Sequence, residues 1–193
     1  TIQNMSGELV LHSERTTPES YELQKLLRER ADAGCSHVVM EASCHALYLD
    51  RVYGIRYDVG VYTNLSRDHL DFHHTMEEYC DAKAILFDNC DVGIYNADDP
   101  WHERLLQNAR CPRRFSYAVH TQADLTAKNV QLHPGSVDFD AEADTEWAQV
   151  HVDTPALFTV YNALDAMACC GNLGVPLAEC ADALAKSHGV KGR

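Results

Sequence analysis

The sequence lacks several features that would place the protein in a common functional class. It contains no apolar run long enough to cross a bilayer, and we expect no signal peptide. Basic residues are scarce, because 16 Lys and Arg stand against 29 Asp and Glu, for a formal net charge of −13. A phosphate backbone or an anionic bilayer would repel such a chain. We therefore expect neither a nucleic acid nor a membrane as its main partner.

Some catalytic signatures are missing as well. The chain has no G-x-x-G-K-T phosphate-binding loop and no glycine pattern of a nucleophile elbow around Ser43. It also has no H-x-H at an early strand end, which a carbamyl-lysine metal hydrolase would use. Its eight cysteines form no C-x-x-C pair. In an α/β chain of this size we expect buried, reduced thiols, which favours a cytoplasmic protein.

What is present is an alternation of helices and strands. Apolar runs predict buried strands at 37–43, 57–65, 92–99 and 113–119. Strand runs between 124 and 155 predict a small antiparallel patch, and two packed helices are predicted at 157–174 and 176–189. The predicted fold is one α/β domain over 1–193, with a mostly parallel sheet flanked by helices.

Capping residues mark two helix starts. Thr17 and Pro18 predict that a helix begins there, and Gly34 is expected to end it. Thr75 and Glu78 form a T-x-x-E capping box, which opens the helix that carries Lys83.

Polar side chains follow two of the predicted strands. Glu41 ends one strand, Asn64 ends the next, and RDHLDFHH follows at 67–74. Because ligands bind beyond the carboxyl ends of parallel strands, we expect these groups to share one edge of the sheet. The Asp and His side chains of 67–74 have two interpretations: ligands of a divalent metal, or a polar loop capping a helix, with His73 and His74 in solvent.

Lys83 also has two interpretations. A lysine among apolar neighbours usually lays its stem along them and keeps its amine in water. A desolvated lysine near other cations has a lowered pKa instead. Its neutral amine can add CO₂ and become a carbamate, which is a carboxylate-like metal ligand that Mg²⁺ would hold in the anionic form.

Several stretches together resemble the Mur ligases, most closely the MurE type, which adds the third peptide residue to a cell-wall precursor. The matching pieces are TTPES, GCSHVVMEASCHAL, YDVGVYTNLSRDHLDFHHTMEEYCDAKAILF, YNADDP, VYNALDAMA, and LGVPLAE followed by GVKGR. They occur in the family's order and cover most of the chain.

The resemblance implies the central, ATPase-like domain of an ATP-dependent amide ligase of peptidoglycan synthesis. Such an enzyme joins a diamino acid, meso-diaminopimelate or L-lysine, to UDP-MurNAc-L-Ala-D-Glu through an acyl phosphate, with Mg²⁺. The matching metal ligands are Glu41, His69 and a carbamylated Lys83, the last two being catalytic. The matching substrate contacts are Thr16, Thr17, Ser43 and Arg51, and the matching nucleotide contact is Asn162.

Parts of the family pattern are absent from this chain. The P-loop, the N-terminal UDP-binding domain and the C-terminal domain would lie outside 1–193, so we expect a piece of a longer protein that is inactive alone. Cys44 stands where the family usually has a second Ser, and Leu49 stands where Gln usually contacts substrate. Two alternatives stay open: a folylpolyglutamate-type amide ligase on the same scaffold, and a binding domain that lost the P-loop and catalysis.

Overall fold

The computed structural model describes residues 3–6, 9–12, 15–68 and 70–187. The helices and strands in chain order are β1 (Gln3–Ser6), β2 (Leu9–His12), α1 (Ser20–Asp32), α2 (Cys44–Tyr48), β3 (Tyr57–Tyr62), α3 (Leu70–His73), α4 (Met76–Asp88), β4 (Cys90–Asn96), α5 (His102–Asn108), β5 (Arg113–Ala118), β6 (Leu125–Leu132), β7 (Val137–Ala143), β8 (Trp147–Val152), α6 (Leu157–Asn172) and α7 (Leu177–Leu184). In these ranges no helix combines the length and the apolar character that crossing a bilayer requires.

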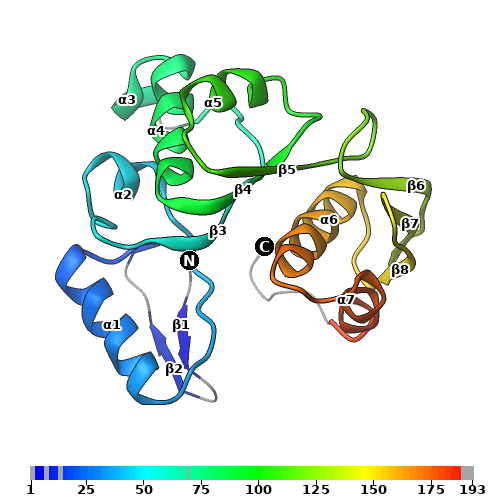
Figure 1. Ribbon diagram of the computed structural model, residues 1–193, viewed down its shortest axis with the longest axis horizontal. Coiled ribbons are helices and arrows are strands. Elements are labelled where there is room, and N and C mark those ends of the chain that lie inside the picture. Colours follow the sequence, from blue (N-terminus) through cyan, green and yellow to red (C-terminus); the bar gives the residue numbers. More distant parts are fainter. Residues whose placement is uncertain (1–2, 7–8, 13–14, 69, 188–193) are drawn as a thin grey trace.

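The central sheet confirms the predicted fold class. Its six strands lie in the order β3-β4-β5-β6-β7-β8. The pairs from β3 to β6 are parallel, and the two pairs from β6 to β8 are antiparallel. Strands β1 and β2 form a separate antiparallel pair beside α1 (Figure 1). Parallel strands joined by helices bring their carboxyl ends to one edge, which is where polar side chains gather here.

Helices cover both faces of the parallel strands. Helices α4 and α5 lie on one side, and α6 lies on the other, against β4 to β7 (Figure 1). Successive side chains of β4 therefore face different layers: Val92 and Ile94 pack in the cluster that includes α6. Gly93 faces α4, where a Cβ would lie only 2.7 Å from the Phe87 ring. Only glycine lets α4 pack this close to the strand.

The ends of α1 agree only partly with the prediction. Gly34 has φ +81°, and the Cys35 N–H donates to the Arg30 carbonyl at 3.0 Å, so glycine ends the helix as expected. The predicted start is wrong, because α1 begins at Ser20, and Thr17 does not cap it. The Thr17 hydroxyl instead bonds the segment at 41–43, described below. The Thr75 cap of α4 is confirmed, since its hydroxyl accepts from the Glu78 N–H at 3.1 Å.

The predicted strand at 37–43 is not a strand in this structure. Val39 is 97% exposed and Val38 is 48% exposed, while Met40 and Ala42 pack beside α2. A strand is held by hydrogen bonds to a neighbouring strand, and no strand in the described part of the chain pairs with this segment. The apolar pattern favoured a strand, but a partner strand for this segment is not found among the described residues.

Candidate active site around Lys83

Lys83 reaches from α4 to the carboxyl end of β3. Its Nζ donates to the Asn64 carbonyl at 3.3 Å. The ammonium lies 5.2 Å from the centre of the Tyr79 ring and 5.8 Å from that of Tyr62. Aromatic faces attract a cation, so both rings help to hold the amine at the sheet edge. The structure thus brings together two groups that the sequence placed nineteen positions apart.

The surroundings of Lys83 disfavour its charged form. Burial lowers the pKa of this amine, against opposing effects of Cys44, Asp99, Cys80 and Glu41. A lowered pKa raises the fraction of neutral amine near neutral pH. This favours the desolvated-lysine interpretation over a lysine whose amine lies in open water. It also shows that Glu41, from a distant part of the chain, is near enough to act on Lys83.

Thr17 joins the start of α1 to the segment that carries Glu41. Its hydroxyl donates to the Glu41 carbonyl at 2.8 Å and accepts from the Ser43 N–H at 3.0 Å. The Ser43 hydroxyl in turn caps α2, accepting from the Ala46 N–H at 3.2 Å. Thr17 is only 1% exposed. Its side chain therefore holds together three of the predicted site residues, and the Ser43 hydroxyl is occupied as a helix cap.

Arg51 lies close to the start of α1 as well. Its Nε is 3.4 Å from the Glu19 carboxylate, and its side chain is 18% exposed. Arg15 pairs with the same Glu19. Thr16 is half-buried beside these residues. The structure thus gathers Thr16, Thr17, Ser43 and Arg51 at the start of α1, where two cations share one carboxylate.

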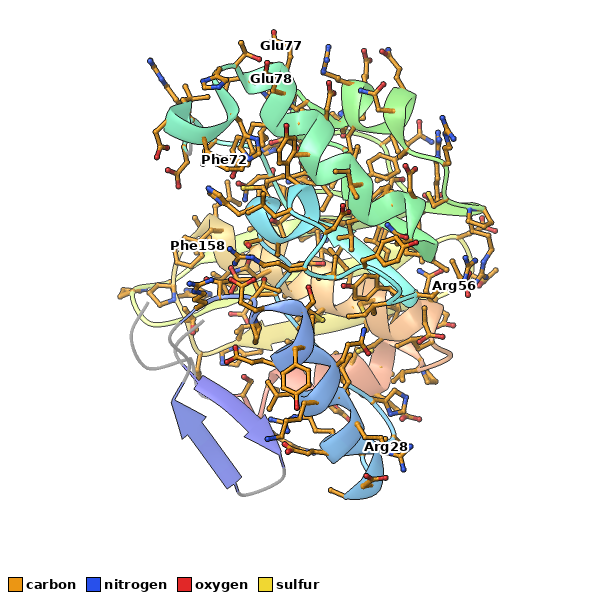
Figure 2. The ribbon with its side chains drawn as sticks, turned by 90° about the vertical axis from the view of Figure 1, so that its left-hand side faces the viewer. Arg28, Arg56, Phe72, Glu77, Glu78 and Phe158 are labelled. Atoms are coloured by element: carbon orange, nitrogen blue, oxygen red, sulfur yellow. The ribbon has the colours of Figure 1, made fainter. Side chains whose placement is uncertain are left out.

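The histidine-rich segment agrees only in part with the polar-loop interpretation. His73 is 2% exposed and stacks on Tyr79, with ring centres 5.2 Å apart, so it is a core residue and not a solvated one. Phe72, from α3, packs edge-on against His73. Phe72 lies near the N-terminal end of α4, where Glu77 and Glu78 point outward (Figure 2). Asp71 and His74 are exposed. The predicted ligand His69 lies outside the described residues.

Asn162 lies on α6, on the face of the sheet opposite α4. Its neighbour Tyr161 donates to the Asp98 carboxylate at 2.8 Å. Asp98 follows the carboxyl end of β4, so the start of α6 is joined to the same sheet edge that holds Lys83. The structure therefore places Asn162 and Lys83 on two sides of one edge, not in a single cluster.

Sequence reasoning did not single out the two acids that follow β4, Asp98 and Asp99. Asp98 accepts from the backbone N–H groups of Val119, His120 and Thr121 at 2.7 to 2.9 Å. Burial alone would raise the pKa of Asp98, but these hydrogen bonds lower it to about 2. Asp99 is 8% exposed and bonds the turn after β3. The available signal was a carboxylate near the end of a buried strand, as for Glu41.

The fold and this edge define an α/β domain whose site is built where parallel strands end. The family model described as the Mur ligase middle domain matches residues 1–170. The chain belongs to the Mur ligase family.

Relatives match along the whole chain but are much longer. The UDP-N-acetylmuramoyl-L-alanyl-D-glutamate–2,6-diaminopimelate ligase of Clostridium botulinum is 40% identical, and ligase 1 of that name from Clostridium acetobutylicum is 42% identical. Each match covers 100% of this chain and 40% of the relative. A solved ligase of the same name is 28% identical with a TM-score of 0.88, over 97% of this chain and 40% of the other. The chain thus spans about 40% of the length of its relatives.

Proposed function

We propose that this chain is the central part of an ATP-dependent ligase that joins 2,6-diaminopimelate to UDP-MurNAc-L-Ala-D-Glu in the cytoplasm. In this reaction ATP phosphorylates the D-glutamate carboxylate, giving an acyl phosphate and ADP. The amine of the diamino acid then attacks the acyl carbon, and phosphate leaves. The names of the relatives favour diaminopimelate over lysine, and over a folylpolyglutamate-type substrate. The P-loop and the two flanking domains belong, in this proposal, to parts of a longer protein outside 1–193.

The observation that carries the proposal is the environment of Lys83. A half-buried amine with a lowered pKa is held by the Asn64 carbonyl at the carboxyl edge of a parallel sheet, within the electrostatic reach of Glu41. A neutral amine adds CO₂ to form a carbamate with loss of one proton. The product is an anion on a long arm, which suits a site that must hold a cation beside phosphate groups.

Mg²⁺ prefers oxygen ligands, and two of the three proposed ligands would supply them. Glu41 and a carbamate on Lys83 would each offer carboxylate-type oxygens, and His69 is the third proposed ligand. Without the carbamate, no three His, Cys, Asp or Glu side chains of the described ranges are grouped closely enough to hold a metal. When bound, Mg²⁺ would offset negative charge on the transferring phosphoryl group.

The remaining site residues have separate tasks in this proposal. Arg51 pairs with an anionic group of the UDP-muramoyl substrate, for which it would exchange its present partner Glu19. Thr16, Thr17 and Ser43 shape the adjoining surface, with Thr17 fixing the backbone through its two hydrogen bonds. Asn162 on α6 contacts the nucleotide from the other side of the sheet edge.

The test is a product assay on the full-length protein that contains this chain. We expect a product with the combined mass of UDP-MurNAc-L-Ala-D-Glu and diaminopimelate less one water, formed with ADP and phosphate. Omitting ATP or either substrate should abolish the product. If no ligated product forms with all three present, the proposed function is wrong. If lysine, and not diaminopimelate, is incorporated, the reaction class stands and the substrate is corrected.

A further inference from the structure

We propose that Asp99 is a positioning residue for Lys83, and that it acts through the peptide between Asn64 and Leu65. The inference rests on the proposed function of Lys83. Asp99 lies three positions after the end of β4, and it is 8% exposed. A buried carboxylate is costly unless donors surround it, so its hydrogen bonds indicate what it holds in place.

Both oxygens of Asp99 accept hydrogen bonds from separate parts of the chain. Oδ1 accepts from the Tyr62 hydroxyl at 2.8 Å and from the Trp101 N–H at 2.9 Å. Oδ2 accepts from the Leu65 N–H at 3.0 Å. The end of β3, the turn that follows it and the start of α5 therefore converge on one side chain. Hydrogen bonds to an ionised acceptor are stronger than those between neutral groups, so Asp99 fixes these three segments relative to one another.

The hydrogen bond between Asp99 and Leu65 connects Asp99 to Lys83. The Leu65 N–H and the Asn64 carbonyl belong to one planar peptide unit and point in opposite directions. Asp99 binds the N–H end, and the Lys83 Nζ binds the carbonyl end at 3.3 Å. Asp99 also anchors the hydroxyl of Tyr62, whose ring lies 5.8 Å from the same amine. One carboxylate thus orients two of the groups that hold the lysine.

An amide cannot replace this carboxylate. Two backbone donors, from Leu65 and Trp101, face different oxygens of Asp99. In Asp99→Asn one of these oxygens becomes an NH₂ donor, so one backbone N–H loses its acceptor whichever way the amide turns. The neighbouring Asp98 offers a matched control, because its bonds go to the turn at 119–121 and to Tyr161.

The experiment uses the full-length protein and three variants, Asp99→Asn, Tyr62→Phe and Asp98→Asn. Steady-state kinetics give kcat and the KM for UDP-MurNAc-L-Ala-D-Glu, and NMR with isotopically labelled bicarbonate gives the carbamate on Lys83. For Asp99→Asn we expect kcat to fall about tenfold or more with KM changed less than about twofold, and the carbamate signal to fall with kcat. Tyr62→Phe keeps the ring, so a smaller fall in kcat is expected. Asp98→Asn should keep the carbamate signal.

A merely structural role would lower the melting temperature without separating kcat from KM. Folded Asp99→Asn with the wild-type kcat and carbamate signal would overturn the proposal, while the ligase function would stand. If Asp99→Asn does not unfold cooperatively, Tyr62→Phe decides, and an unchanged kcat in that variant overturns the proposal. If the wild type forms a carbamate that depends on Asp99 but no ligated product, positioning holds and the proposed function fails.

Discussion

The two halves of the sheet differ in the side chains that they bury. The parallel half, β3 to β5 with α4 and α5, encloses the polar groups Asp99 and Asn96 and four buried cysteines. The antiparallel half, β6 to β8 with α6 and α7, supplies most of the larger apolar cluster, centred on Val160, Leu164 and Met167, to which the parallel strands add Val92, Ile94 and Tyr117. Burying polar groups is costly and burying aliphatic groups is stabilising. We infer that the antiparallel half holds the domain together and that the parallel half carries the chemistry.

The sharpest form of this comparison is Lys83→Ala. Because the amine is needed for the carbamate, we expect ligase activity of the full-length protein to fall by roughly a thousandfold. The free energy of unfolding should change by less than about 1 kcal/mol, since the side chain is only half-buried. The matched control is Lys25→Ala, an exposed lysine on α1 that pairs with Glu29. Near-normal activity of Lys83→Ala would remove the chemical role of the parallel half.

The antiparallel half is tested through its core. Leu164 on α6 has no exposed surface, and Leu164→Ala should lower the free energy of unfolding by about 3 kcal/mol, as core truncations do. Urea unfolding of the chain measures it. The counterpart is Val39→Ala, which should change stability by less than about 0.5 kcal/mol because Val39 is 97% exposed. Equal losses from both substitutions would contradict the claim that the apolar cluster around Leu164 holds the domain together.

Asp98 links the halves, because it bonds the turn before β6 and Tyr161 on α6. The pKa of Asp98 is about 2 in the folded protein, below its ordinary 3.8. The folded state therefore binds fewer protons than the unfolded state between these values. The resulting stability is present above pH ~4 and is lost as the pH falls through ~2. Asp98→Asn should remove this acid-dependent part of the unfolding free energy.

Asp165 on α6 is the control, because its effect on stability should depend on pH in the opposite direction. Burial raises the pKa of Asp165 to about 7, so the folded state binds more protons than the unfolded state above pH ~4. Its contribution therefore falls as pH rises from ~4 to ~7, and Asp165→Asn should be more stable than the wild type at pH ~8. Urea titrations at several pH values check both aspartates. If the free energies of unfolding of Asp98→Asn and Asp165→Asn change with pH in the same way, neither carboxylate behaves as described.

The smallest expected effect is on substrate affinity. Arg51→Ala should raise the KM for UDP-MurNAc-L-Ala-D-Glu about tenfold, while the KM for ATP changes less than about twofold. The reason is that Arg51 lies at the start of α1, where it pairs with Glu19, whereas the proposed nucleotide contact Asn162 lies on α6. An unchanged KM for the UDP-muramoyl substrate would count against this role.

Local signals in the sequence predicted most of the fold. The Thr75 cap, the glycine that ends α1 and the runs that became β3, β4 and β5 are short-range patterns, and each is confirmed. The strand at 37–43 could not be judged in the same way, because a strand depends on a partner that may be far away in sequence. Thr17 failed as a predicted cap for a similar reason: its hydroxyl bonds residues 24 and 26 positions away.

The candidate site was predictable in its parts but not in its connections. Lys83 and Asn64 were both singled out, yet only the structure shows that one donates to the carbonyl of the other. Asp99 was overlooked because two of its three hydrogen bonds come from donors 34 and 37 positions away, which no local spacing encodes. His73 was misjudged because a histidine in a polar string can still stack in a core.

The central claim is that Lys83 works as a carbamate, and spectroscopy of the full-length protein tests it most directly. Wild type and Lys83→Ala would be equilibrated with isotopically labelled bicarbonate and Mg²⁺ near neutral pH, and their NMR spectra compared. A carbamate signal in the wild type that is missing from Lys83→Ala is the predicted result. Identical spectra for the two proteins would contradict the account.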